Sequence, residues 1–105
     1  MVVTCSDDKT IKGWSVKKKN FMFALPGHSN WVRSCKLSPD SRLVVSGSDD
    51  CSVRVWDVAE SRELYKWRTP LLVNSVDWVS EGTSVCAGGA DGSVDIWDVR
   101  SNRLV

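Results

Sequence analysis

Residues 44–58 read VVSGSDDCSVRVWDV, and two near-copies of this stretch occur in the same chain. One copy, VVTCSDDKTIKGWSV, covers residues 2–16, and the other, VCAGGADGSVDIWDV, covers residues 85–99. The copies carry tryptophans spaced 42 and 41 residues apart, namely Trp14, Trp56 and Trp97. A repeat of this period predicts a chain built from stacked copies of one supersecondary unit.

Each copy has the pattern of two short strands joined by a tight turn. Residues 53–56, VRVW, alternate apolar and polar side chains as a half-buried strand does, and residues 43–45 form a short apolar run. The dipeptides Asp49-Asp50 and Asp91-Gly92 supply residues typical of hairpin turns. No window has a sustained helical period, so the sequence predicts no long helix and an all-β fold class.

The period and the Trp-Asp ending resemble the WD40 family, in which a repeat of roughly 40–45 residues forms one four-stranded blade. Residues 32–48 also align with residues 73–89 without a gap, so the resemblance covers essentially the whole chain. It implies a WD40 β-propeller fragment of about two and a half four-stranded antiparallel blades, which this chain does not close. Residues 1–25 would end one blade, residues 26–67 would form a complete blade, and residues 68–105 would form a third with a truncated outer strand.

Because this alignment starts the chain at the second strand of a blade, we expect it to be part of a longer propeller. Two open blade faces predict that the isolated chain is unstable or aggregates. A cooperative thermal transition from a monodisperse monomer would contradict that expectation.

Composition narrows the classes of partner. The formal net charge of +1 leaves no electrostatic footprint for nucleic acid or for an anionic membrane. We also expect no transmembrane helix and no signal peptide, because the chain has neither the long apolar run nor the basic start that these need. The basic run at residues 17–19 is either a solvated loop or a small contact for an acidic protein surface.

The cysteines do not form a metal-binding pattern. They include no C-x-x-C pair, and the single histidine cannot complete a Cys/His zinc set, so we expect no metal and no cofactor. We interpret them as reduced thiols of a cytosolic protein. The strand patterns place Cys5, Cys35 and Cys86 in the core and Cys51 in a turn.

A histidine, an aspartate and several serines raise the hypothesis of a hydrolase, but no G-x-S-x-G motif accompanies them. The resemblance to WD40 blades implies instead a structural hydrogen-bond network of a histidine, a turn aspartate, a strand hydroxyl and a tryptophan. In such a network the tryptophan would supply a buried N–H donor. The histidine would relay the chain of hydrogen bonds, and the turn aspartate would accept the last one. The matching residues in the middle copy are His28, Asp50, Trp56 and one of Ser46 or Ser52. We therefore expect no catalytic residues.

The flanking copies keep only part of this network. In the last copy Asp91 and Trp97 remain, but Thr69 stands where His28 stands in the middle copy. In the first copy Asp8 and Trp14 remain, and the segment that would carry the histidine lies before the first residue. We expect only the middle blade to have a complete network.

WD40 proteins usually bind partners on the propeller face that carries the loops before each blade, and the resemblance implies the same here. The candidate partner-binding residues on these loops are Asn30, Trp31, Arg33, Leu72 and Asn74. Trp31 is the strongest candidate because tryptophan and arginine dominate interface hot spots. The alternative is that Trp31 is wedged between adjacent blades.

Three segments, residues 21–33, 35–43 and 97–104, resemble the centriolar WD40 proteins of the proteome-of-centriole set. This resemblance implies a structural protein of centrioles, basal bodies and cilia that helps to hold microtubule triplets together. Its partners would be centriolar proteins, tubulin or microtubule-associated proteins, in the cytoplasm and the cytoskeleton, with no small-molecule substrate. The chain departs from this pattern at Ser41, which replaces a turn glycine, and at residues 68–72.

A second hypothesis comes from residues 97–100, WDVR, which fit the W-D-x-R motif by which some WD40 proteins dock on a cullin adaptor. The chain would then be a substrate receptor of a ubiquitin ligase. Co-purification separates the two hypotheses, because one predicts the ligase adaptor and the other predicts tubulin or centriolar proteins. An enzyme is disfavoured because no acid–base pair recurs outside the repeat pattern.

Overall fold

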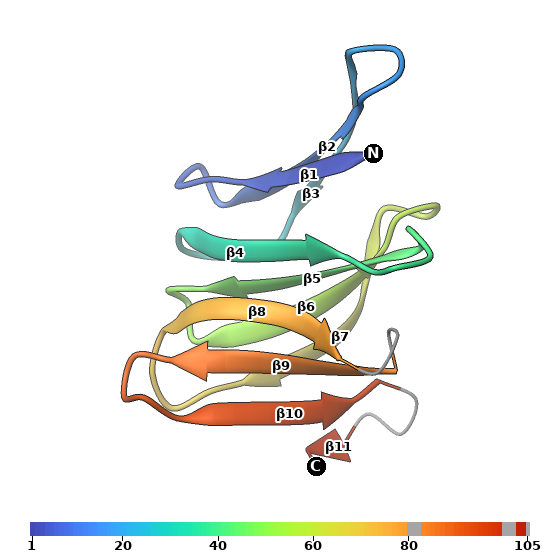
Figure 1. The fold of residues 1–105 in the computed structure, drawn as a ribbon. Coiled ribbons are helices and arrows are strands. Elements are labelled where there is room, and N and C mark those ends of the chain that lie inside the picture. The colour runs from blue at the N-terminus through green and yellow to red at the C-terminus, as the bar shows by residue number, and fades with distance from the viewer. Residues whose placement is uncertain (80–82, 100–102, 105) are drawn as a thin grey trace.

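The computed structural model describes residues 1–79, 83–99 and 103–104 and arranges them in three antiparallel sheets (Figure 1). The first sheet has the order β1 (Val2–Cys5), β2 (Thr10–Ser15), β3 (Asn20–Pro26). The second has the order β4 (Val32–Leu37), β5 (Leu43–Ser48), β6 (Ser52–Asp57), β7 (Arg62–Arg68). The third contains β8 (Val73–Val79), β9 (Ser84–Gly89), β10 (Val94–Asp98) and β11 (Arg103–Leu104), in that order.

The predicted all-β class is confirmed, and so is the unclosed stack of sheets with three or four strands. None of the residues that the structure describes forms a helix long and apolar enough to cross a membrane. The repeat also fixes the strand register. Each copy pairs its tryptophan with a valine at the first or second position of the preceding strand, as Val44 pairs with Trp56 and Val85 pairs with Trp97.

The sheets lie one above another in chain order, and apolar side chains fill the space between them (Figure 1). Successive residues of a strand point to opposite faces, so Val44 packs toward the first sheet and Val45 toward the third. Both side chains are fully buried, and burying a valine contributes roughly 1.5 kcal/mol or more. Strand β5 is therefore covered on both faces, which explains its continuous apolar and small-residue sequence.

Aromatic rings strengthen the contact between the second and third sheets. Trp67 of β7 stacks on Trp97 of β10 with ring centroids 5.2 Å apart, and Tyr65 stacks on Trp67 at 5.8 Å. Trp67 and Trp97 are both buried. The repeated tryptophan is therefore a packing residue wherever a preceding sheet covers it.

At the two ends of the stack the same repeat positions are exposed. Trp14, the counterpart of the buried Trp56, is 38% exposed on the first sheet. Val94 of the third sheet is 68% exposed, whereas its counterpart Val53 is fully buried against the next sheet. Packing between sheets decides these burials, because the strands themselves have the same sequence pattern.

One position of the hairpin turn has a left-handed backbone in all three sheets. The φ angles are 73° at Lys9, 63° at Cys51 and 83° at Gly92. Only glycine adopts this conformation without steric cost, so the first two turns carry backbone strain that the third does not. Ser41, where the family pattern has a glycine, also has a positive φ of 62°.

Candidate functional site

The loop before β4 and the β5–β6 hairpin turn meet at one end of the second sheet, at the left of Figure 1. The Trp31 carbonyl oxygen accepts a hydrogen bond from the Asp49 N–H at 2.9 Å and another from the Ser48 hydroxyl at 2.6 Å. Asp50 reaches back across the same junction and accepts the Ser29 N–H at 3.0 Å. These bonds fix a long loop to a rigid hairpin, which makes this end the natural place for a preformed surface.

A buried chain of polar side chains lies directly beneath the loop. His28 Nδ1 lies 2.7 Å from Asp50 Oδ2, and His28 Nε2 lies 2.7 Å from Ser46 Oγ. Trp56 Nε1 donates to Ser46 Oγ at 2.9 Å. Ser52 donates to the other Asp50 oxygen at 2.5 Å. Both of the serines that the sequence left as alternatives therefore take part.

The electrostatics of this network favour a neutral histidine. Burial lowers the pKa of His28 and outweighs the opposing effect of Asp50, so the ring donates through Nδ1 to the carboxylate and accepts at Nε2 from Ser46. Burial alone would raise the pKa of Asp50, but hydrogen bonds from Ser52 and His28 lower it below its ordinary value. The carboxylate is therefore ionised and the imidazole neutral near neutral pH.

The order Ser46–His28–Asp50 has the connectivity of a hydrolase triad, but the surroundings do not permit that chemistry. The Ser46 side chain is fully buried in the middle of β5, and its oxygen already accepts the Trp56 donor. A nucleophile needs a free path to a carbonyl carbon and an oxyanion site beside it. In this fold the three residues join a loop to a hairpin and have no access to substrate.

Arg54 is a member of this network that the sequence reading missed. It is almost fully buried, and its guanidinium donates to the Gly27 carbonyl oxygen at 2.5 Å, to Asp50 at 3.2 Å and to Glu63 at 3.1 Å. Its alternation with valines in β6 suggested a solvent-facing side chain. The available signal was the spacing of a turn aspartate and a basic residue four positions later, which Asp8 and Lys12 repeat in the first sheet.

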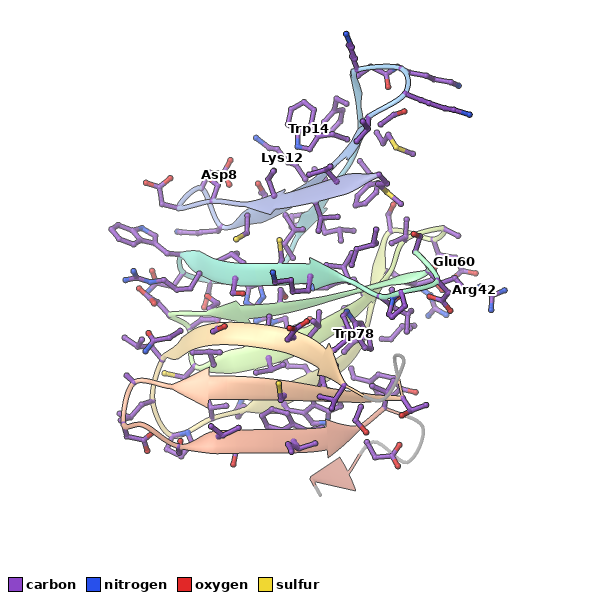
Figure 2. All side chains as sticks on the ribbon, in the orientation of Figure 1. Asp8, Lys12, Trp14, Arg42, Glu60 and Trp78 are labelled. Atoms are coloured by element: carbon purple, nitrogen blue, oxygen red, sulfur yellow. The ribbon has the colours of Figure 1, made fainter. Side chains whose placement is uncertain are left out.

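The first sheet has the same residue types without the network. Asp8 accepts hydrogen bonds from the Thr10 N–H at 3.0 Å and the Thr10 hydroxyl at 2.6 Å, and it pairs with Lys12 at 3.2 Å. Trp14 Nε1 donates to the Thr4 hydroxyl at 3.0 Å. Figure 2 shows Asp8, Lys12 and Trp14 on the side of the first sheet that points away from the second. Trp14 and Asp8 are therefore placed like their counterparts but bond only to neighbours in their own sheet.

The third sheet also has only part of this hydrogen-bond network among its described residues. Asp91 accepts hydrogen bonds from the Ser93 N–H at 3.0 Å and the Ser93 hydroxyl at 2.5 Å. The hydroxyl of Thr69, which replaces the histidine, donates to the Leu71 carbonyl oxygen at 2.7 Å. Asp91 thus orders its own turn, while Thr69 orders the preceding loop.

A cluster of Trp31, Arg33 and Asp49 forms the exposed part of this end. The Trp31 side chain is 48% exposed, and the Arg33 guanidinium carbon lies 5.3 Å from the centre of its ring. Arg33 also makes two parallel bonds to Asp49, Nε to Oδ1 at 2.7 Å and an outer nitrogen to Oδ2 at 2.9 Å. The arginine is held by both partners at once, so the indole and the guanidinium have one preferred arrangement.

The other predicted partner-binding residues differ in their exposure to solvent. Asn30 and Asn74 are exposed, and the Asn30 side-chain oxygen accepts the Trp31 N–H at 2.8 Å. Leu72 is half-buried, and the neighbouring Leu71 is the more exposed leucine of that loop. Of the W-D-x-R motif, Trp97 is buried between sheets and Arg100 lies outside the described residues.

The remaining ligand-binding possibilities are limited in the described ranges. Across residues 1–79, 83–99 and 103–104, no group of three or more histidine, cysteine, aspartate or glutamate side chains is placed to hold a metal ion. A pocket of about 460 Å³ lies at the opposite end of the second sheet, between residues 40–43 and 57–59. Figure 2 labels Arg42 and Glu60 at this end, away from the Trp31 loop.

Comparison with known proteins places the chain in one family. The WD40 family, described as WD domain, G-beta repeat, matches residues 19–57 and 62–98. The chain is 32% identical over 104 residues to the small ribosomal subunit protein RACK1y of Oryza sativa, covering 99% of this chain and 31% of that protein. It is 36% identical over 104 residues to the nuclear distribution protein PAC1 of Yarrowia lipolytica, covering 91% of this chain and 24% of that protein.

A third relative is the eukaryotic translation initiation factor 3 subunit I of Schizosaccharomyces pombe, 31% identical over 87 residues and covered over 26% of its length. The chain therefore spans about a third or less of these curated relatives. The family match extends over most of the chain; its first copy contains β3 to β6 and its second contains β7 to β10. This chain belongs to the WD40 repeat family.

Proposed function

We propose that this chain is a non-catalytic protein-interaction scaffold that works as a structural component of centrioles, basal bodies and cilia. WD repeats are the repeats of protein-interaction scaffolds, and the relatives that share them carry names from quite different cellular roles. The centriolar assignment, with its location in the cytoplasm and cytoskeleton, is supported by the resemblance of residues 21–33, 35–43 and 97–104. In this role the chain contacts tubulin or other centriolar proteins and stabilises microtubule triplets.

The single observation that carries the scaffold function is the exposed cluster of Trp31, Arg33 and Asp49. An exposed indole offers a large contact area, and tryptophan and arginine are enriched among residues that dominate binding energy. The bonds of Arg33 to Asp49 and its position over Trp31 fix the pair before a partner arrives. A fixed side chain loses less conformational entropy on binding than a mobile one, so this surface suits a protein partner.

Affinity isolation of the tagged chain from ciliated cells, followed by mass spectrometry, tests this proposal. We expect tubulin or centriolar proteins to be enriched. The Trp31→Ala variant should bind the recovered partner more weakly by more than about 1 kcal/mol while the fold persists. Met22→Ala is the matched control, because Met22 is exposed to a similar extent on β3, away from the Trp31 loop.

Two outcomes would contradict the proposal. Equal binding by the wild-type chain and the Trp31→Ala variant would remove the cluster as the binding surface. Loss of folding on the same substitution would show that Trp31 is a packing residue between blades. Circular dichroism of both variants distinguishes a lost contact from a lost fold.

The cullin-adaptor hypothesis predicts a different protein in the same isolation. The ubiquitin-ligase adaptor would then be recovered, and an Asp98→Ala change in the W-D-x-R motif would release it. Trp31→Ala would leave that binding unchanged, because the motif begins within β10 of the third sheet. Recovery of tubulin that is insensitive to Asp98→Ala supports the scaffold proposal instead.

A further inference from the structure

Two cysteine thiols meet across the contact between the first and second sheets. Cys5 ends β1 and Cys35 lies within β4, and both pack against the apolar cluster between these sheets. The two strands also meet through their backbones, because the Ser6 carbonyl oxygen, next to Cys5, accepts the N–H of Val32 at the start of β4 at 3.2 Å. Both are only half-buried, so a small reagent has a path to them.

The repeat gives independent evidence for this proximity. Cys5 stands at the repeat position of Gly47, and Cys35 stands at the repeat position of Val76. The strand registers around these positions are the same in the corresponding sheets. The contact between Gly47 and Val76 is therefore the internal counterpart of the contact between Cys5 and Cys35.

The two strands approach each other closely at that counterpart. A Cβ built on Gly47 would lie 2.8 Å from Val76 Cγ1. In the first contact the Cβ exists and belongs to Cys5, and the matching γ atom is the Cys35 sulfur. A disulfide needs Cβ atoms about 3.8 Å apart, which two side chains in such direct contact can reach.

We propose that Cys5 and Cys35 are an oxidative modification site, at which a low-molecular-weight disulfide such as oxidised glutathione introduces an intramolecular disulfide that links the first sheet to the second. In the reduced chain described above, all four cysteines are free. The link would hold the first sheet in place. That sheet has three strands where the others have four, and among the described residues it packs against the second sheet.

The local environment prepares Cys5 for this exchange. The interaction with the neighbouring Cys35 thiol lowers the pKa of the Cys5 thiol to about 7, against a smaller opposing effect of burial. The same interaction, together with burial, raises the pKa of the Cys35 thiol. Cys5 is therefore the attacking thiolate and Cys35 is the resolving thiol.

The chemistry balances in two exchange steps. The Cys5 thiolate attacks one sulfur of oxidised glutathione, forms a mixed disulfide and expels one glutathione thiolate. Cys35 loses its proton to that thiolate and attacks the Cys5 sulfur, which forms the Cys5–Cys35 bond and expels the second glutathione. The two cysteine sulfurs lose two electrons in total, and oxidised glutathione gains them to become one thiol, which carries the Cys35 proton, and one thiolate.

The other two cysteines have different surroundings. Cys51 sits in the β5–β6 turn, where its sulfur lies 3.8 Å from the Asp49 carbonyl oxygen. Cys86 lies on β9 of the third sheet, opposite Ile96 of β10. Selective pairing of Cys5 with Cys35 is therefore a consequence of the fold and not of cysteine content.

Peptide mapping of the 105-residue chain tests the site. The chain is equilibrated with a mixture of reduced and oxidised glutathione, quenched with acid, alkylated and digested with trypsin. Cleavage after Lys9, Arg33 and Lys36 should release residues 1–9 joined to residues 34–36. We expect this species to exceed every other cysteine pairing by at least about tenfold, because the fold brings Cys5 and Cys35 to the same contact between two sheets.

Matched variants separate the site from general thiol oxidation. Cys5→Ser and Cys35→Val, the second of which introduces the residue found at the equivalent position of β8, should abolish the linked peptide. A Cys51→Ser, Cys86→Ser double variant should retain it in full. Dominant links through Cys51 or Cys86, mixed glutathione disulfides alone, or an equal yield of the Cys5–Cys35 link in concentrated urea would each overturn the proposal.

Discussion

The imidazole of His28 and the carboxylate of Asp50 lie 2.7 Å apart although 22 residues separate them in the chain. Both side chains are almost completely buried, at 0% and 4% exposure. One belongs to the loop before the second sheet and the other to the hairpin turn inside it. The contact therefore sets the position of the Trp31 loop, on which the proposed binding surface depends.

Removing the histidine should destabilise the chain strongly. His28→Ala leaves the Asp50 carboxylate and the Ser46 hydroxyl without their buried partner, and we expect a loss of about 3 kcal/mol in the free energy of unfolding. Urea unfolding followed by tryptophan fluorescence measures it. The matched control is Thr69→Ala at the equivalent position of the third sheet, where we expect a loss of less than about 1 kcal/mol. Equal losses in the two variants would show that the network does not stabilise the second sheet.

The neutral state of His28 predicts a pH dependence of stability. Because burial holds its pKa below the ordinary value of 6.5, the unfolded chain binds a proton that the folded chain does not. The resulting stability is fully present above about pH 6.5 and is lost as the pH falls from there toward the folded pKa, by up to about 1.4 kcal/mol per pH unit.

In a Cys5→Ser background, which removes the thiol whose pKa is about 7, this slope can be assigned to one residue, because the chain has a single histidine and Asp50 titrates below its ordinary value of 3.8. The free energy of unfolding should be measured at several pH values between about 4.5 and 7.5. A His28→Gln variant should be less stable throughout and should have no slope between about pH 6.5 and 5. An unchanged slope in that variant would point to a group other than His28.

Two equivalent glycines should respond in opposite directions to alanine. A Cβ on Gly47 would lie 2.5 Å from Val73 Cγ1, whereas a Cβ on Gly88 meets no atom within 4 Å. Gly47→Ala should therefore cost about 1–3 kcal/mol through overpacking between sheets. Gly88→Ala should gain up to about 1 kcal/mol, because alanine restricts the unfolded chain. Thermal unfolding of both variants checks this, and a loss of stability in Gly88→Ala would contradict the open environment of that position.

The hairpin turns offer a stabilising substitution. Cys51 has a φ of 63°, and its counterpart Gly92 has a φ of 83°. Cys51→Gly should relieve the left-handed strain and raise the free energy of unfolding by about 0.5–1 kcal/mol. Gly92→Ala should lower it by about 1 kcal/mol for the converse reason. A destabilised Cys51→Gly variant would mean that the thiol, with its contact to Asp49, contributes more than the backbone strain costs.

Local patterns carried much of the information about the strands. Alternation in residues 53–56 and the turn dipeptides located β5, β6, β9 and β10, because a period of two and a reversal signal are properties of short segments. The residue types of the network followed from the family resemblance. Arg54 did not follow, because alternation assigns it to the solvent side of a strand, and its partners Gly27 and Glu63 come from a loop and a strand distant along the chain.

The sequence by itself determined the repeat, its period, the strand class and the residues capable of forming a polar network, since these depend on neighbours along the chain. The tertiary structure decided in which copies these residues are buried and form the polar network. Trp14, Trp56 and Trp97 occupy the same repeat position, yet the first is exposed and the other two are buried. The physical reason is that burial and hydrogen bonding at each position depend on the adjacent sheet, which the local sequence does not encode.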